Sequence, residues 1–145
     1  MKLSVTTPRG SVVDTDVDEI TAPGLLGELG VLPGHVPLMA ALKPGVLTFR
    51  QHDKPLSTLA VGEGFLQVAP VVAGDTSTDR VLVLVDHALS ASAVDRAAAE
   101  KELAKLEGEI AAWKAELDGA YDALLIRRGW AQARLDVAGR ATPAH

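Results

Sequence analysis

The sequence predicts a chain of two parts: an N-terminal antiparallel β sandwich or barrel, and a C-terminal pair of α helices folded back as an antiparallel hairpin. Up to about residue 90, apolar and polar residues alternate in short runs separated by turn-forming residues, which is typical of strands. After Ser90 no proline occurs until Pro143, and apolar residues recur every three or four positions, as in a helix. We therefore predict a β domain at residues 1–89 and a helical hairpin at residues 90–140.

Two of the strand predictions, at 3–6 and 13–17, rest on alternation with a period of two, and the other four rest on short runs rich in β-forming residues. In the clearest case, Val13, Thr15 and Val17 face one side and the aspartates that follow each of them face the other, as in a half-buried strand. The predicted strands lie at residues 3–6, 13–17, 46–50, 56–61, 65–69 and 81–85. Residues 72–80 are polar and contain a glycine, so we predict a solvated hairpin loop there.

The helical half carries a heptad seam, which is typical of a helix that packs against another helix. The seam consists of Leu103, Leu106, Ile110, Trp113, Leu117, Ala120 and Leu124. Ser90 or Ser92 is the predicted N-cap. The seam alone allows one continuous helix from about 92 to 138, but Asp118 and Gly119 read as a turn. We predict two helices of roughly 20 residues with a break near 117–120.

The two alternatives for the helical half differ in reach. A folded hairpin would be about 35 Å long, whereas a continuous helix would reach roughly 70 Å at about 1.5 Å per residue. A glycine inside a helix costs about 1 kcal/mol, so both forms are accessible in energy.

Composition excludes several classes of function. The chain has 145 residues and no cysteine, which excludes disulfides, thiolate chemistry and Cys-based zinc sites. The formal net charge of -5 argues against nucleic acid as the main partner. No stretch reaches the roughly 18 apolar residues that a membrane span needs. Apolar residues make up 48% of the chain and aromatic residues 3%, so the core must consist of Val, Leu, Ile and Ala.

No motif in the sequence predicts an enzyme. The run DTDVDE at 14–19 starts like a calcium-binding loop, but Glu19 stands where glycine is required and Leu25 where glutamate is required. The run VGEGF at 61–65 lacks the third glycine of a dinucleotide-binding fingerprint. The four histidines have no metal-like spacing. We predict no catalytic residue and no metal site.

Residues 27–45 read GELGVLPGHVPLMAALKPG, a stretch too interrupted for a helix and too long for a turn. An apolar, turn-rich surface is a liability on an isolated protein and an interface in a complex. This stretch resembles the signature of the epsilon subunit of bacterial and chloroplast-type F-type ATP synthases. The flanking runs TTPRGSVVDTDVDEITAPG, VGEGFLQVAP and VLVLVDHA agree, so the resemblance covers nearly the whole chain.

The resemblance implies a sandwich of about ten strands followed by two antiparallel helices. It also implies a rotor subunit without chemistry of its own, which joins the gamma subunit to the membrane c-ring in the central stalk of a proton-translocating ATP synthase. The implied c-ring contacts are Glu28, Leu29 and Gly30, and the implied gamma contacts are His35, Val36 and Pro37. We expect a peripheral location on the cytoplasmic side of a bacterial plasma membrane.

The resemblance further implies that the helices open and rise along gamma to block ATP hydrolysis by the alpha and beta subunits of the catalytic head. Arg127 and Arg134 are seven residues apart, so they share a face of the last helix, and Arg128 lies beside it. We expect these three arginines to meet acidic residues of a catalytic beta subunit.

An alternative function is a nucleotide-sensing module that binds ATP at the hairpin. Some family members bind ATP through the pattern I/L-D-x-x-R-A, which aligns here with residues 94–99. Asp95 is kept, but Ala98 stands where the arginine belongs, and Arg96 lies about 200° away around the helix. We therefore predict weak or no ATP binding and no cofactor.

Overall fold

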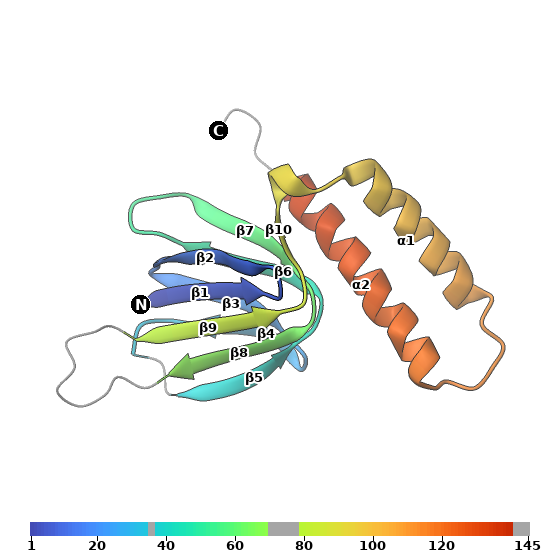
Figure 1. Cartoon of the computed structure of the whole chain (residues 1–145), viewed down its shortest axis with the longest axis horizontal. Coiled ribbons are helices and arrows are strands. Elements are labelled where there is room, and N and C mark those ends of the chain that lie inside the picture. The colour runs from blue at the N-terminus through green and yellow to red at the C-terminus, as the bar shows by residue number, and fades with distance from the viewer. Residues whose placement is uncertain (35–36, 70–78, 141–145) are drawn as a thin grey trace.

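The computed structural model describes residues 1–34, 37–69 and 79–140, and its first part is a β sandwich of ten strands (Figure 1). The strands are β1 (Lys2–Thr7), β2 (Gly10–Asp16), β3 (Glu19–Gly24), β4 (Gly27–Val31), β5 (Leu38–Leu42), β6 (Gly45–Arg50), β7 (Leu56–Val61), β8 (Gly64–Ala69), β9 (Arg80–Val85) and β10 (Ala88–Ser90). The predicted solvated loop at 72–80 falls almost entirely outside the described residues. The predicted domain boundary at Leu89 falls inside β10.

The strands form one sheet in the order β10-β7-β6-β3-β5-β8-β9-β1-β2, with β4 paired to β3. Between β3 and β5 the pairing is reduced to Gly24 and Leu42, and there the sheet folds into two layers. One layer holds β5, β8, β9, β1 and β2, and the other holds β3, β4, β6, β7 and β10. Neighbouring strands are antiparallel, as predicted, except that β1 and β9 run parallel.

The core lies between the layers and consists of aliphatic side chains with one aromatic residue, Phe49, as the composition predicts. On β1 Leu3 and Val5 are fully buried, and on β8 Leu66 and Val68 take the same inward positions. The six predicted strands all form. The sequence did not locate β3, β4, β5 and β10 individually: β3 and β4 contain glycine or proline, β5 directly follows Pro37, and β10 has only 3 residues.

The second part is a helical hairpin, as predicted, made of α1 (Arg96–Ala111) and α2 (Gly119–Arg140). The prediction of the break was partly wrong, because the chain leaves the helix at Ala112 and residues 112–118 form a longer connection. The seam therefore holds at Leu106, which is buried, but not at Leu117, which is exposed in the connection. Asp118 ends the connection by accepting hydrogen bonds from the backbone N–H groups of Ala120 and Tyr121.

The predicted N-cap of the first helix was also wrong. A short 3-10 helix, η1 (Ala91–Ala93), follows Ser90, and the hydroxyls of Ser90 and Ser92 bond to each other at 3.1 Å. The N-cap of α1 is Asp95, whose carboxylate accepts a hydrogen bond of 3.0 Å from the backbone N–H of Ala98. Aspartate and serine are equally good N-cap residues, so residue type does not distinguish Asp95 from Ser90 or Ser92. The point at which the helix begins selects Asp95.

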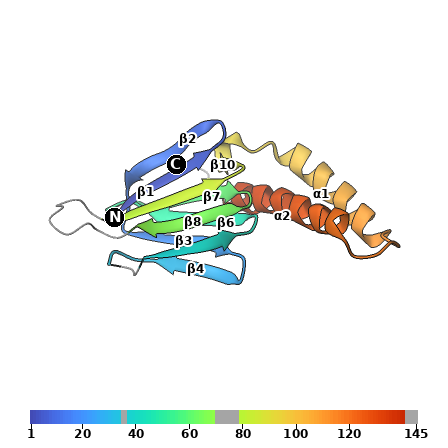
Figure 2. The ribbon, with the colours of Figure 1, turned by 60° about the horizontal axis from the view of Figure 1, so that its bottom comes forward.

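The hairpin lies against the sandwich through one of its helices. Helix α2 packs on β6, β7 and η1, and α1 packs on the outer side of α2 (Figures 1 and 2). The contact buries Ala60, Ala133 and Val137, with Val46 and Trp130 partly buried around them. Small side chains let α2 approach the sheet closely, and Gly129 lies over Pro44.

Candidate partner-binding surfaces

The turn between β3 and β4 forms an apolar surface that the sandwich itself leaves uncovered. Leu25 and Leu26 occupy this turn and are both exposed, Leu26 completely. Together with Met39 on β5 they line a groove of about 510 Å³. We call this surface the turn groove; its lining is Gly24, Leu25, Leu26, Gly27, Glu28, Leu29, Met39, Ala40 and Ala41.

Glycines shape the turn groove. A Cβ at Gly24 would lie 2.5 Å from the carbonyl oxygen of Gly27, which no side chain tolerates. Gly27 has a φ of 137°, a conformation that L side chains rarely adopt. The backbone N–H of Leu25 donates to the carbonyl of Ala41 at 2.9 Å and fastens the turn to β5. The leucines therefore project outward from a rigid turn.

The three residues predicted to contact the c-ring lie on β4, next to this turn. Glu28 is exposed and faces the turn groove, Gly30 is exposed, and Leu29 is half-buried against the core. In Figure 2, β4 lies at the margin of the sandwich opposite β2. The strand pairs with β3 and is an edge strand of the sheet, so its other side is open to a partner.

A second surface follows from the register of β5, β8, β9 and β1, which lie side by side in Figure 1. Side chains at alternate positions point away from the core, and we call this side the outer face. One half of the outer face is apolar. Phe65 is paired with Ala41 of β5 on one side and with Leu84 of β9 on the other. Met39 lies two residues before Ala41 on β5 and therefore on the same side of the sheet. Met39, Phe65 and Leu84 are 66%, 54% and 47% exposed.

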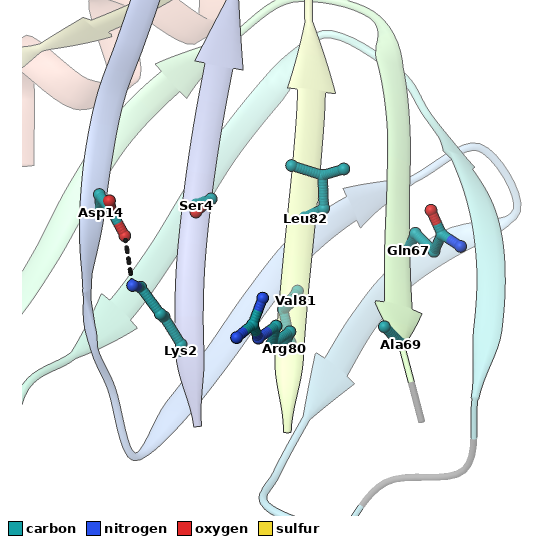
Figure 3. A pocket seen from close by; sticks show the side chains of 8 residues that line it. All are labelled: Lys2, Ser4, Asp14, Gln67, Ala69, Arg80, Val81 and Leu82. Atoms are coloured by element: carbon teal, nitrogen blue, oxygen red, sulfur yellow. Dashed lines mark ion pairs between the residues drawn. The ribbon is translucent and has the colours of Figure 1, made fainter. Parts of the chain in front are cut away.

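The other half of the outer face is polar and hollowed, as Figure 3 shows. Lys2 and Arg80 are register partners on the parallel strands β1 and β9. The Lys2 ammonium lies 3.5 Å from a carboxylate oxygen of Asp14. Gln67 and Leu82, also paired in register, complete the hollow of about 310 Å³. The outer face thus offers a partner both apolar contact and two cations.

Of the residues predicted to contact gamma, His35 and Val36 lie outside the described residues. Pro37 is exposed and directly precedes β5, the strand that carries Met39 to the outer face. On the other side of this gap, the backbone N–H of Gly34 donates to a carboxylate oxygen of Asp79 at 2.5 Å, which ties the segment to the start of β9. The structure therefore locates one of the three residues, at the rim of the outer face.

The three candidate arginines of the last helix have different surroundings. Arg127 is exposed and lines a groove between the helices with Lys101 and Lys105 of α1. Arg128 is half-buried. Arg134 is ion-paired with Glu102 of α1, and its side chain is only 14% exposed. The helix therefore does not present the three side chains together.

The candidate nucleotide residues both have partners within α1. Asp95 is the N-cap, and the Arg96 guanidinium lies 3.4 Å from the carboxylate of Glu100. Ala98, at the position where the family pattern has arginine, lines the groove that also holds Lys101 and Arg127. Both candidate residues thus have a local structural role.

Within residues 1–34, 37–69 and 79–140, no group of three or more His, Asp or Glu side chains is arranged to hold a metal ion. No polar or charged residue among them is fully buried. None of the helices in the same part of the chain combines the length and apolar character that crossing a membrane requires.

Sequence reasoning missed the exposed apolar residues of the outer face. Phe65 and Leu84 were assigned to strands, but alternation in a strand states which residues share a side and not which side is buried. A usable signal was present at Leu82 and Leu84, because β9 is apolar at nearly every position, which is typical of a strand covered on both sides.

Comparison with known proteins identifies relatives along nearly the whole chain. Residues 1–91 match the family described as ATP synthase, Delta/Epsilon chain, beta-sandwich domain. The chain is 37% identical to ATP synthase epsilon chain 2 of Syntrophotalea carbinolica over 140 residues, which cover 97% of this chain and 94% of that protein. It is 38% identical to the ATP synthase epsilon chain of Geobacter sp. strain M21, covering 98% of this chain and 96% of that protein.

Two solved structures share the fold. One is a chain in the cryo-EM structure of the Euglena gracilis mitochondrial ATP synthase, OSCP/F1/c-ring, with a TM-score of 0.73 and 22% identity over 95% of this chain and 80% of that chain. The other is a chain of the Tetrahymena thermophila mitochondrial ATP synthase central stalk and c-ring, with a TM-score of 0.55 and 17% identity over 98% of this chain and 96% of that chain.

The capping role of Asp95 leads to a first prediction. Asp95→Ala removes the acceptor of the Ala98 N–H and should lower the free energy of unfolding by about 1 kcal/mol. Urea denaturation followed by circular dichroism measures this change. Asp95→Asn keeps an acceptor and should have little effect, so an equal loss in both variants would contradict the capping role.

Proposed function

This chain belongs to the ATP synthase delta/epsilon family, and from that premise we propose that it is a non-catalytic subunit of the central stalk of a proton-translocating F-type ATP synthase. In this proposal the sandwich joins the gamma subunit to the c-ring. The observation that carries the proposal is the pair of uncovered surfaces, the turn groove and the outer face. Monomeric proteins rarely expose contiguous apolar surface on this scale without a partner.

The turn groove is the proposed contact with the c-ring, through Glu28, Leu29 and Gly30 and the adjoining leucines. A fully exposed leucine beside an exposed carboxylate suits a partner surface that is partly apolar and partly polar. Because the turn is fastened to β5 and shaped by glycines, it can transmit torque without deforming. Attachment to the ring would place the protein at the cytoplasmic side of a bacterial plasma membrane.

The outer face is the proposed contact with gamma. Pro37, at its rim, connects it to the predicted gamma contacts at His35 and Val36. Phe65 and Leu84 supply the apolar centre, and Met39, which also lines the turn groove, lies where the two surfaces adjoin. The hollow with Lys2, Asp14 and Arg80 supplies a charged border. An apolar centre with a polar rim is the usual anatomy of a protein interface.

The hairpin is the proposed regulatory part, which opens and blocks ATP hydrolysis at the catalytic head. Two features support this. The fully buried residues of the contact between hairpin and sandwich are the small side chains of Ala60, Ala133 and Val137, so burial of large aliphatic side chains contributes little to its stability. Straightened, its two helices would have about twice the reach of the folded form. Arg127, Arg128 and Arg134 are the proposed contacts with acidic residues of beta.

We further propose that ATP is at most a weak ligand of the hairpin. Asp95 and Arg96 already have partners in α1, and position 98 offers no guanidinium. Lys101, Lys105 and Arg127 do line a groove beside Ala98, but the three residues are exposed to solvent, which screens their charges. The nucleotide-sensing alternative therefore has less support than the coupling role.

The proposed gamma contact predicts a specific loss of binding. Phe65→Asp should weaken binding of the full chain to a catalytic head that carries gamma by more than about tenfold, because it buries an unpaired carboxylate. Fluorescence anisotropy of the labelled chain measures the affinity. Val12→Asp is the matched control, since Val12 is a similarly exposed apolar residue on β2, away from the apolar half of the outer face. Equal effects of both substitutions would refute the assignment.

The proposed inhibitory face predicts a relief of inhibition. The double variant Arg127→Glu with Arg128→Glu should raise the half-inhibitory concentration for ATP hydrolysis by the gamma-containing head by about tenfold, because reversed charges repel acidic partners. The control is Arg9→Glu with Lys54→Glu, a double reversal at exposed turn residues of the sandwich. Unchanged inhibition in the arginine variant would exclude this role of α2.

The nucleotide prediction is tested by calorimetry. The full chain should give no measurable heat with ATP at micromolar concentrations, whereas Ala98→Arg should gain binding because it restores the missing cation of the pattern. Ala97→Arg adds the same charge at the neighbouring exposed position and should not gain binding. Micromolar affinity of the unaltered chain would overturn the prediction.

A further inference from the structure

One continuous set of contacts joins α1, α2 and the sandwich. It runs from Glu102 on α1 to Arg134 and Trp130 on α2, and from Trp130 to His87, which lies between β9 and β10. We infer that these four residues form a latch that holds α1 against α2 and α2 against the sandwich, and that keeps Arg134 covered while the hairpin is folded.

The first contact of the latch is the ion pair between Glu102 and Arg134. These residues are 32 positions apart in sequence and are brought together by the hairpin alone. Their side chains are 34% and 14% exposed, so the pair is screened less than the ion pair of Arg96 and Glu100, whose side chains are 65% and 60% exposed. Loss of the glutamate would leave a mostly covered guanidinium with no counter-charge, which is strongly unfavourable.

The second contact places the same guanidinium over an aromatic ring. The central carbon of the Arg134 guanidinium lies 5.4 Å from the centroid of Trp130, within the range of a cation–π interaction. Its Nε also donates to the Trp130 carbonyl at 3.4 Å. Arg134 therefore contacts a carboxylate from α1 and the ring of Trp130, which lies four residues earlier on its own helix. Of these two contacts, only the one with the carboxylate depends on the folded hairpin.

The third contact ties Trp130 to the sandwich. Its ring stacks on His87 with centroids 5.2 Å apart and an angle of 21° between the planes. His87 is fixed by its backbone, because its carbonyl accepts a hydrogen bond of 2.8 Å from the N–H of Gly62. The latch thus spans three layers: the outer helix, the inner helix and the β domain.

The rest of the contact between hairpin and sandwich is small. Its buried residues are two alanines and one valine, Ala60, Ala133 and Val137, and alanine buries little apolar area. No large aliphatic side chain is buried there. The polar and aromatic contacts of the latch therefore determine much of the position that the folded hairpin takes on the sandwich.

The latch has a consequence for regulation, which rests on the proposed inhibitory function. In the folded hairpin the Arg134 side chain is paired with Glu102 and only 14% exposed, so it is covered from an acidic residue of the beta subunit. Glu102 and the catalytic head therefore compete for one guanidinium, and the folded hairpin withholds one of the three inhibitory arginines. The catalytic head shifts the hairpin from the folded to the open form only if it binds the open form more tightly. Arg134, which is covered in the folded form, supplies that difference in affinity.

The latch itself is tested on the isolated full chain. The protein has no cysteine, so Lys54→Cys on the sandwich and Lys114→Cys in the connection take spin labels specifically. Glu102→Ala should raise the fraction of molecules with a long label-to-label distance by about tenfold, as expected for loss of a charged hydrogen bond. Glu100→Ala, two positions away on α1, is the matched control and should leave the distances unchanged.

A charge exchange separates a latch from a merely structural pair. Glu102→Arg combined with Arg134→Glu should restore the short distance, because it re-forms the ion pair with reversed direction. Unchanged distances in Glu102→Ala would overturn the latch. Loss of helix content by circular dichroism in both Glu102→Ala and the exchange variant would also overturn it, because the pair would then maintain the helices and not their docking.

The competition for Arg134 is tested by ATP hydrolysis of the gamma-containing head. Glu102→Ala frees Arg134 and should lower the half-inhibitory concentration about threefold, whereas Arg134→Ala opens the hairpin without the cation and should not. If both variants strengthen inhibition equally, Arg134 does not contact the catalytic head, and the proposed competition between Glu102 and the head for Arg134 is refuted. If the labels report opening but neither variant alters hydrolysis, the latch stands and the proposed inhibitory function fails.

Discussion

Burial of one side of each strand in the first layer of the sandwich determines most of what this molecule presents to its surroundings. Leu3, Leu66 and Val83 point into the core, so their neighbours along β1, β8 and β9 must point outward. Because the pairing register aligns these outward positions, Phe65 meets Leu84 and Lys2 meets Arg80. The apolar and cationic halves of the outer face are thus consequences of core packing.

The turn groove depends on the same packing in a different way. The sheet has to fold into two layers where β3 gives way to β5, and little strand pairing remains at that point. The turn after β3 is closed by glycines and by a backbone bond to Ala41, which leaves Leu25 and Leu26 with no core to enter. A surface of this kind is unfavourable on a free monomer and suits a subunit that is permanently covered.

The hairpin is attached by a different balance of forces. The residues that helix α2 buries fully against the sheet are small, Ala133 and Val137, and Gly129 lies over Pro44, so the helix approaches closely without burying a large aliphatic side chain. The contacts of Arg134 and Trp130 with their partners orient the hairpin and contribute much of its attachment. A firm sandwich with a lightly held hairpin divides the chain into a part suited to permanent coupling and a part suited to movement.

Much of this protein is determined by its sequence alone. Alternation and short β-rich runs predicted six strands, the change of period at Ser90 predicted the hairpin, and residues 27–45 indicated the family, because these signals are local in the chain. Tertiary structure decided the rest. It moved the helix cap to Asp95, took Leu117 out of the seam, and covered Arg134 by pairing it with Glu102 while leaving Arg127 exposed. Such outcomes depend on which distant residues meet, and a periodic pattern carries no information about residues 32 positions apart.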